Sequence, residues 1–409
     1  MPIVPQNHTD QITASVVLKR DREASLQRKH TWLFSGAVAR VEGKPLPGDL
    51  VRICTAEGKV VALGFYEGES IFVRIISFSP DTFTDIETLL RERLFAAFRL
   101  RKSLGLMRPD NNVFRLVYGE GDALPGLIVD IYGSTAVLQA HTAAMYRRRQ
   151  IIATLLQEIF PEQGIRAVFD KSAATLPETL ELSTLNSYLI GTSSDEPLYE
   201  NGLRIAADWI HGQKTGFFID QRENRALVAQ HAASRRVLNL FSYTGGFSLY
   251  ALRGGATEVV SLDSSKRATE AAEDAVKLNF DAATASRHQT VTEDAFDYLN
   301  RLEADRFDLI IVDPPAFAKR RGNIKNALNG YRKLNRAVLE KVAPGGLVFT
   351  FSCSQLVSAQ DFRLALLTAS LEAGRSVRIL RQLGQAPCHP INICHPETEY
   401  LKGLLLYVE

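Results

Sequence analysis

The stretch VLNLFSYTGGFSLYALRGG (residues 237–255) decides the fold of this chain. A short apolar run leads into the paired glycines Gly245 and Gly246, and a helical pattern follows them. Glycine lets a backbone turn tightly and lets a ligand approach closely, and a helix that begins there offers free N–H groups. The spacing differs from the G-x-G-x-x-G of dinucleotide-binding proteins. The stretch predicts a strand–turn–helix unit that binds a small nucleoside, with an ordinary βα turn as the alternative.

The rest of this region alternates strands with helices. Strands are predicted over 236–241, 258–263, a run ending near 292–294, 307–314, 345–352, 376–383 and 400–408, with helical stretches between the first five. Such alternation is typical of a parallel sheet with helices on both faces. We therefore predict an α/β, Rossmann-like domain with a seven-stranded sheet over residues 196–409.

Two smaller domains are predicted before it. Residues 1–83 form a β-rich domain, with strands over 16–20, 49–55, 59–67 and 71–77 and a helix over 21–30. Residues 84–195 form a small α+β central domain, with helices over 84–105 and 146–160 and strands over 113–119, 127–132, 136–140 and 165–172. A hairpin over 198–208 is expected to turn at Asn201-Gly202.

Carboxylates stand at the ends of the second and third strands of the large domain. Asp263 lies 18 residues after Gly245, where an acidic side chain can accept hydrogen bonds from a ribose diol. Asp294 follows the third strand and is placed to reach an adenine amino group. Each of them is also a plausible helix N-cap. Together with the glycine turn they predict a nucleoside cofactor at the carboxyl ends of the strands.

The next two strands end in groups suited to catalysis. Strand 307–314 runs into Asp313-Pro314-Pro315-Ala316-Phe317, whose prolines predict a stiff loop that presents Asp313 to a planar ring. Strand 345–352 runs into Cys353, which an open parallel sheet would place beside Asp313. A buried turn and a small core cysteine are the alternatives.

A cysteine at this position suggests methylation of a pyrimidine carbon. C5 of a pyrimidine is a weak nucleophile, and a thiolate that adds at C6 makes C5 enamine-like. The enzyme would also need a group at the N3 edge to handle developing charge, a role that suits Asp313 when it is protonated.

Five motifs in this order resemble the RlmI family of large-subunit ribosomal RNA (cytosine-C5) methyltransferases. They are NLFSYTGGFSLYALRGGA (239–256), SLDSS (261–265), DPPAF (313–317), FSCS (351–354) and HPETEYLKG (395–403). The segment GQKTGFFIDQRENR (212–225) resembles the part of that family that closes over the cofactor. HTWLFSGAV (30–38) and PGDLVRI (47–53) resemble a PUA RNA-binding domain.

The resemblance implies a class I methyltransferase domain and S-adenosylmethionine as the cofactor. It implies that Cys353 is the catalytic nucleophile and that Asp313 is catalytic with it. The predicted cofactor contacts are Phe218, Asp220, Gln221, Arg222, Asn239, Phe241, Tyr243, Thr244, Gly245, Gly246, Asp263, Ser264, Ser265, Asp294, Ala295, Asp313 and Pro314. The loop around Asp313 lacks the second cysteine found in many other RNA cytosine-C5 methyltransferases.

Local charge predicts where RNA binds. The chain has 409 residues and a formal charge of only +2, so its overall charge neither requires nor excludes nucleic acid. The basic run after the Asp313 loop is favoured as the phosphate contact, and Arg332, Lys333 and Arg336 would extend it. The predicted RNA contacts are Pro315, Phe317, Lys319, Arg320, Arg321 and Lys325. His30 and Trp32 are candidates for stacking on RNA, with Trp32 favoured as core.

Other expectations concern metal, location and assembly. Cys388-His389 and Cys394-His395 lack a standard zinc spacing, so no metal is predicted. The chain has four cysteines and no long apolar run or signal pattern, which favours a cytoplasmic protein without a membrane partner. The predicted partner is ribosomal RNA, and a homodimer is one possible assembly.

Two other functions stay open. A ribosomal RNA guanine-N2 methyltransferase would share the D-P-P-x-F loop but would have no need of Cys353. A non-catalytic RNA-binding assembly factor would have a cofactor fold that does not bind S-adenosylmethionine.

Overall fold

The computed structural model describes residues 11–12, 14–160, 164–176, 185–192, 195–318 and 321–409. The chain forms two compact units. The first consists of Met1–Leu198, Ala207–Phe217 and Pro387–Thr398, and the second of Tyr199–Ala206, Phe218–Ala386 and Glu399–Glu409. Two short segments of the first unit are therefore flanked in the sequence by residues of the second.

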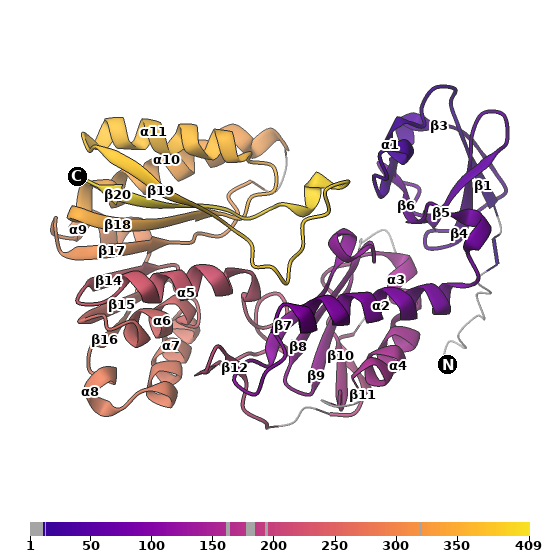
Figure 1. The fold of residues 1–409 in the computed structure, drawn as a ribbon. Helices are drawn as coiled ribbons and strands as arrows, with labels where there is room; N and C mark the ends of the chain where they lie inside the picture. The colour runs from indigo at the N-terminus through magenta and orange to yellow at the C-terminus, as the bar shows by residue number, and fades with distance from the viewer. Residues whose placement is uncertain (1–10, 13, 161–163, 177–184, 193–194, 319–320) are drawn as a thin grey trace. The chain divides into compact units, whose positions relative to one another are not determined.

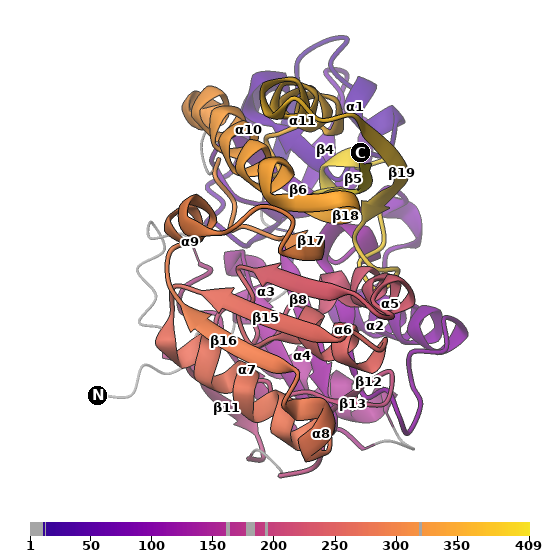
Figure 2. The same cartoon turned by 90° about the vertical axis from the view of Figure 1, so that its left-hand side faces the viewer.

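The second unit is built on a seven-stranded sheet with the order β16-β15-β14-β17-β18-β20-β19. The strands are β14 (Arg236–Leu240), β15 (Glu258–Asp263), β16 (His288–Thr292), β17 (Phe307–Val312), β18 (Val342–Ser352), β19 (Val377–Gly384) and β20 (Lys402–Val408). Figure 2 shows β16, β15, β17 and β18 in this order across the sheet. The first five are parallel, whereas β20 runs antiparallel to β18 and β19. The predicted seven-stranded sheet is confirmed.

Helices cover both faces of this sheet. They are α5 (Arg222–His231), α6 (Gly246–Arg253), α7 (Lys266–Asn279), α8 (Ala282–Ala285), α9 (Ala295–Arg301), α10 (Ile324–Lys341) and α11 (Ala359–Ala373). Successive residues of a strand point to opposite faces. Leu238 and Leu240 of β14 belong to a core cluster with residues of α9, α10 and α11. Between them, Asn239 donates to the Ser248 hydroxyl of α6 at 2.9 Å, so α6 lies on the other face.

The first unit contains a six-stranded N-terminal sheet with the order β2-β6-β5-β4-β1-β3. Its elements are β1 (Ala14–Leu18), α1 (Ala24–Gln27), β2 (Trp32–Phe34), β3 (Val38–Glu42), β4 (Leu50–Cys54), β5 (Val60–Tyr66) and β6 (Ile71–Ser77). The helix predicted over 21–30 was wrong in length, because α1 has only four residues. Asp21 and Lys29 adopt positive φ angles of 60° and 56°, which a helix does not tolerate.

A five-stranded central sheet follows in the same unit, with the order β11-β10-β9-β8-β7 (Figure 1). Its elements are α2 (Ile86–Ser103), β7 (Val113–Tyr118), β8 (Leu127–Tyr132), β9 (Thr135–Ala140), α3 (Ala143–Arg147), α4 (Arg149–Ile159), β10 (Ala167–Asp170) and β11 (Ser187–Ile190). The helix predicted over 146–160 is two helices that meet at Arg148. The guanidinium of Arg148 donates to the Ala144 carbonyl at 2.9 Å and thereby ties the two helices together.

The hairpin that opens the second unit consists of β12 (Tyr199–Glu200) and β13 (Leu203–Arg204). Asn201 and Gly202 have φ angles of 50° and 81°, as a two-residue hairpin turn requires, so the predicted turn is confirmed. The division at 83 and 195 into three domains remains our proposal. Over the described ranges, no helix has the length and apolar character that a bilayer crossing demands.

Candidate active site

The glycine turn after β14 is strained in a way that suits a ligand site. Phe241, Tyr243 and Gly245 all have positive φ, at 58°, 45° and 75°. A Cβ atom on Gly245 would lie 2.9 Å from the Ala272 methyl, so the turn excludes larger residues here. Non-glycine residues adopt this conformation at a cost, and such strain is concentrated at functional sites. Thr244, between the strained positions, is half-buried.

Asp263 holds this turn in place. Its Oδ2 accepts the Tyr243 amide at 2.9 Å, and its Oδ1 accepts the Ser265 amide at 2.9 Å. The alternative of Asp263 as a helix N-cap was wrong, because Ser265 caps α7 by accepting the Ala268 amide. Each carboxylate oxygen has a second lone pair, so these bonds are compatible with a contact to ribose.

Asp294 is the N-cap of α9, which confirms the alternative interpretation that this residue is a helix cap. Its Oδ1 accepts the amides of Phe296 and Asp297 at 2.8 and 3.3 Å. Asp294 is exposed and Ala295 is buried behind it. Ser264 is exposed beside the Asp263 carboxylate. The structure thus brings the ends of β14, β15 and β16 to one edge of the sheet.

Two buried side-chain oxygens at this edge lack hydrogen-bond partners among the described residues, and a bound cofactor could supply them. Within the described ranges, Asn239 Oδ1 and Ser242 Oγ belong to the few buried side-chain atoms that have no hydrogen-bond partner. Asn239 is the second-last residue of β14. Ser242 lies in the turn that follows this strand. An unsatisfied buried acceptor or donor costs about 1–3 kcal/mol. A ligand that carries amino and hydroxyl groups would satisfy both, so these residues fit S-adenosylmethionine.

The segment 218–225 borders the same site. The Phe218 ring packs edge-on against Tyr243, with ring centroids 5.3 Å apart. Arg225 donates to the Phe218 carbonyl at 2.8 Å and forms a buried ion pair with Glu200 at 2.7 Å. These contacts fix the backbone from which Asp220, Gln221 and Arg222 extend. All three are buried, and Asp220 accepts a hydrogen bond from the Tyr400 hydroxyl.

Cys353 and Asp313 are brought together as the sequence predicted. They follow β18 and β17, which are adjacent and parallel, with Val312 opposite Thr350. The Cys353 thiol lies 3.8 Å from the Pro314 carbonyl oxygen and donates toward it. Gln221 Nε2 donates to Asp313 Oδ2 at 3.0 Å, which joins the 218–225 segment to the Asp313 loop. Cys353 is half-buried, so it is not a core cysteine.

Ser354 fastens the loop after β18 to the Asp313 loop after β17. Its Oγ accepts the Ala318 amide at 3.3 Å and lies 2.9 Å from the Tyr331 hydroxyl of α10. Its carbonyl oxygen accepts from Lys402 Nζ at 2.6 Å. Ser354 is completely buried. The position of its neighbour Cys353 therefore depends on contacts from three separate segments.

Lys402 is a residue beside the Cys353 loop that the sequence reasoning missed. It begins β20 and was interpreted only as part of a strand, although it closes the HPETEYLKG motif. The residue is 8% exposed, and its ammonium also donates to the Tyr400 carbonyl at 2.6 Å. Burial lowers the pKa of Lys402 to about 8, while the nearby Cys353 thiolate acts in the opposite direction. The sequence offered one signal for this residue: a charged lysine at the start of an otherwise apolar strand, where a buried charge needs partners.

The predicted RNA contacts are only partly visible. Lys319 and Arg320 lie outside the described residues, and Arg321 is described by its backbone alone, at the start of a 3-10 turn. Pro315 and Lys325 are exposed. The Phe317 ring packs against the Tyr331 ring of α10, with centroids 4.7 Å apart. This contact anchors the Asp313 loop to α10.

Two residues proposed to extend the basic patch have acidic partners. Arg332 pairs with Glu372, and Arg336 pairs with Glu340 at 2.8 Å. Lys333 is exposed. Among the described side chains of the predicted patch, Lys325 and Lys333 are therefore exposed and open to phosphate.

Comparison with protein families gives two matches. A model described as S-adenosylmethionine-dependent methyltransferase matches residues 187–405, and a PUA-like domain model matches residues 16–78. Ribosomal RNA large subunit methyltransferase I of Erwinia tasmaniensis is 38% identical over 397 residues, which cover 96% of this chain and 98% of that protein. The protein of the same name from Escherichia coli is 36% identical over 397 residues, with the same coverage.

Solved structures give the same fold. One described as an S-adenosylmethionine-dependent methyltransferase from Streptococcus mutans has a TM-score of 0.80 and 22% identity, and covers 97% of this chain and 100% of its own. A second, described as a methyltransferase in complex with SAH, has a TM-score of 0.81 and 23% identity with the same coverage. At these identities the likeness concerns the fold alone.

Proposed function

The chain belongs to the S-adenosylmethionine-dependent methyltransferase family that includes ribosomal RNA large subunit methyltransferase I, and from this we propose that it methylates C5 of a cytosine in large-subunit ribosomal RNA. The cofactor is S-adenosylmethionine, and the enzyme is a methyltransferase. The choice of cytosine, of its C5 atom and of a covalent route is our proposal. Methylation of ribosomal RNA would place the protein in the cytoplasm.

One observation carries the proposal. Cys353 Sγ lies 3.8 Å from the Pro314 carbonyl oxygen, at the ends of two adjacent parallel strands. A thiol at the edge where the cofactor binds has no role in methylation of an exocyclic nitrogen, whose lone pair attacks directly. It does have a role in methylation of a pyrimidine carbon, because C5 needs activation.

The proposed mechanism assigns each step to a residue of this chain. S-adenosylmethionine supplies the electrophilic methyl group. The Cys353 thiolate adds to C6, and the electron pair of the C5–C6 double bond is driven toward the N3 edge of the ring. C5 then carries the nucleophilic electron pair and would take the methyl group as the sulfur–methyl bond breaks, so that S-adenosylhomocysteine would leave as a neutral thioether. Loss of the C5 proton to a base re-forms the double bond and expels the Cys353 thiolate.

Asp313 and Lys402 support the thiolate and the ring in this proposal. We assign the Asp313 carboxyl to the N3 edge, where a proton donor stabilises the charge that develops on addition. Gln221 orients this carboxyl through its bond to Oδ2. We assign Lys402 as a positioning residue, because it holds the Ser354 carbonyl next to Cys353 and adds a positive charge near the thiolate.

The target base must reach the edge of the sheet that carries Cys353 and Asp313 for this chemistry to take place. Enzymes that act on base atoms take the base out of its stack, and the flanking phosphates then need positive contacts. Lys325 at the start of α10 follows the Asp313 loop and is exposed. We propose that it contacts the RNA backbone with Lys319, Arg320 and Arg321.

Sequence-resolved mapping of 5-methylcytosine in ribosomal RNA tests this function. Cells that lack the protein should lose one 5-methylcytosine in the large-subunit RNA. Re-expression of the wild-type chain should restore it, and re-expression of Cys353→Ala should not. An unchanged 5-methylcytosine map together with a missing N2-methylguanine would reject the proposal in favour of guanine methylation.

A further inference from the structure

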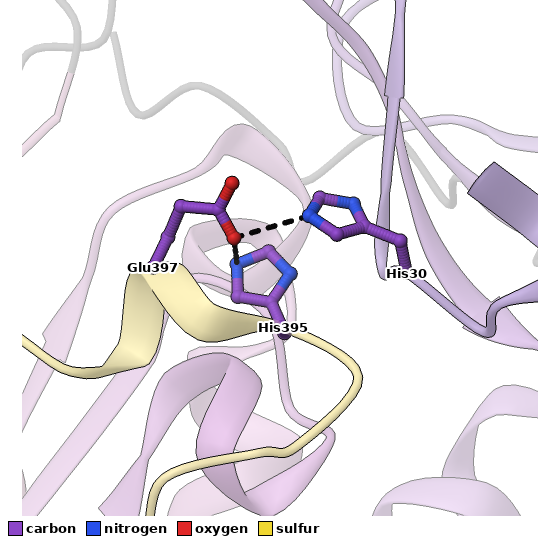
Figure 3. A group of neighbouring side chains, drawn as sticks. All are labelled: His30, His395 and Glu397. Carbon is purple, nitrogen blue, oxygen red and sulfur yellow. Dashed lines mark hydrogen bonds and ion pairs between the residues drawn. The ribbon is translucent and has the colours of Figure 1, made fainter.

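Two histidines and a glutamate of the first unit converge on one point. His30 precedes β2, whereas His395 and Glu397 lie in the segment Pro387–Thr398, 367 positions away in the case of Glu397. His30 Nε2 lies 3.1 Å from Glu397 Oε2, and His395 Nε2 lies 3.8 Å from the same oxygen. Figure 3 shows both rings turning a nitrogen toward this one carboxylate oxygen. The three atoms lie within 4.8 Å of one another.

These separations match the spacing of ligands around a zinc ion. Zinc binds histidine nitrogen and carboxylate oxygen at about 2.0–2.2 Å. An ion about 2.1 Å from each atom would give ligand angles of about 95° for the 3.1 Å pair and about 130° for the 3.8 Å pair. The two values bracket the tetrahedral angle. The 3.8 Å separation is too long for a hydrogen bond, so a direct bond does not explain the position of the His395 ring.

The other nitrogen of each ring has a partner that can set its tautomer. His395 Nδ1 lies 2.9 Å from the Thr31 hydroxyl. His30 Nδ1 lies 3.1 Å from both the carbonyl oxygen and the amide nitrogen of Trp32. With the proton on Nδ1, the His395 ring donates to the Thr31 hydroxyl and directs its Nε2 lone pair toward Glu397. His30 has two arrangements: Nδ1 accepts from the Trp32 amide while Nε2–H donates to Glu397 at 3.1 Å, or Nδ1–H donates to the Trp32 carbonyl and leaves the Nε2 lone pair for a metal ion. Metal-binding histidines are held by the latter arrangement.

His395 lies in a buried, aromatic environment. His395 is 1% exposed, and the edge of its ring packs against Trp32 with centroids 4.4 Å apart. Glu397 is partly exposed, which gives an ion a path from solvent.

We propose that His30, His395 and Glu397 bind a zinc ion, with water as the fourth ligand, and that the ion fastens the segment Pro387–Thr398 to the N-terminal sheet. This revises the expectation of no metal. It also differs from the sequence pattern, in which Cys394 and His395 stood together. Among the described residues, the cluster consists of His30, His395 and Glu397, and Cys388 does not belong to it. The inference does not depend on the reaction that the enzyme performs.

Zinc titration of the full chain tests the site. The purified protein is stripped with a chelator and titrated with Zn²⁺ in competition with a chromophoric chelator. The wild type should bind one equivalent, and its melting temperature should rise with zinc. His395→Gln and Glu397→Gln should each bind at least tenfold more weakly and lose the thermal shift. S-adenosylmethionine binding checks that each variant is folded.

Matched controls separate this site from other ligands in the chain. His211 has a similar carboxylate neighbour, with Asp208 at 3.7 Å, so His211→Gln should bind zinc like the wild type. Cys394→Ser should also keep full affinity. Absence of stoichiometric binding by the wild type would overturn the proposal without any variant. It would equally be overturned if His395→Gln and Glu397→Gln kept wild-type affinity, or if Cys394→Ser lost it.

Discussion

Removal of the Lys402 charge should raise the pKa of the Cys353 thiol. Lys402→Met keeps a long apolar side chain in the buried position and deletes the ammonium beside Ser354. The thiolate then loses a cation with which it interacts, and a thiolate without a neighbouring cation forms at higher pH. The reactivity of Cys353 reports on this change directly and needs no RNA.

The size of the effect follows from the geometry. Lys402 Nζ lies 2.6 Å from the carbonyl oxygen of Ser354, and one extended residue spans about 3.3 Å, so the charge is roughly 6–8 Å from the Cys353 sulfur. At an effective dielectric constant of about 20, such a pair interacts by about 2–3 kcal/mol. Solvent at the half-buried sulfur reduces this to about 1–1.5 kcal/mol, or about one pKa unit.

Alkylation of Cys353 by iodoacetamide as a function of pH measures this shift. Peptide mass spectrometry separates Cys353 from the buried Cys54 and Cys388 and from Cys394. In Lys402→Met the midpoint should rise by about one unit. At pH 7 the rate should fall only about threefold, because a tenfold loss of thiolate is partly offset by its greater nucleophilicity. Above pH 8 the difference should fade, since the pKa of Lys402 is about 8 and the wild-type ammonium is then lost.

Two lysine variants serve as controls. Lys402→Arg keeps the charge and should keep the midpoint near that of the wild type. Lys341 also donates to a backbone carbonyl, that of Leu302, at 2.5 Å. Both residues are far from Cys353 in the sequence, so Lys341→Met should leave the midpoint of Cys353 alkylation unchanged. An unchanged midpoint in Lys402→Met, or an equal shift in Lys341→Met, would refute the reasoning.

Three further perturbations test separate parts of the account. Asp263→Ala should weaken S-adenosylmethionine binding about tenfold to a hundredfold, because the turn loses its anchor and the ribose its acceptor; unchanged calorimetric affinity would remove Asp263 from the site. Neutralising Arg321 and Lys325 together should lower the salt slope of RNA binding by about one per lost phosphate contact at constant cofactor affinity, and an unchanged slope in filter binding would exclude this patch. Burial lowers the pKa of His288 to about 4, below its unfolded value, so its neutral ring contributes full stability above pH 6.5 and loses it as pH falls toward 4. Between pH 6.5 and 4, the free energy of unfolding measured in urea should therefore fall by about 1–3 kcal/mol less in His288→Gln than in the wild type. An identical fall in both proteins would contradict the lowered pKa of His288.

The sequence was sufficient for the parts of the fold that local patterns encode. Periodicity and glycine chemistry predicted β14, the turn at Gly245 and the seven-stranded sheet. Because parallel strands end at one edge, the same pattern was enough to place Asp313 beside Cys353. Asn201-Gly202 was predicted for a similar reason, since both positions need positive φ.

Contacts between residues far apart in the sequence could not be predicted from local patterns. The bond from Lys402 to the Ser354 carbonyl joins residues 48 positions apart, and no periodic pattern reports such a bond. His30 was considered only for stacking on RNA, whereas its ring lies 4.4 Å from that of His395. Asp263 was a plausible cap, but Ser265, two residues later, is the cap in the structure. Side-chain geometry decides such choices between neighbouring residues.

Covalent trapping on 5-fluorocytosine RNA tests the central claim most directly. Fluorine at C5 prevents loss of the C5 proton, so the thiolate that has added at C6 cannot leave. Wild-type enzyme with S-adenosylmethionine and 5-fluorocytosine-substituted ribosomal RNA should form an adduct that survives denaturing electrophoresis. Cys353→Ala should form none while it still binds cofactor and RNA. A wild-type enzyme that forms no adduct, together with near-normal methyl transfer by Cys353→Ala, would contradict C5 methylation through a cysteine.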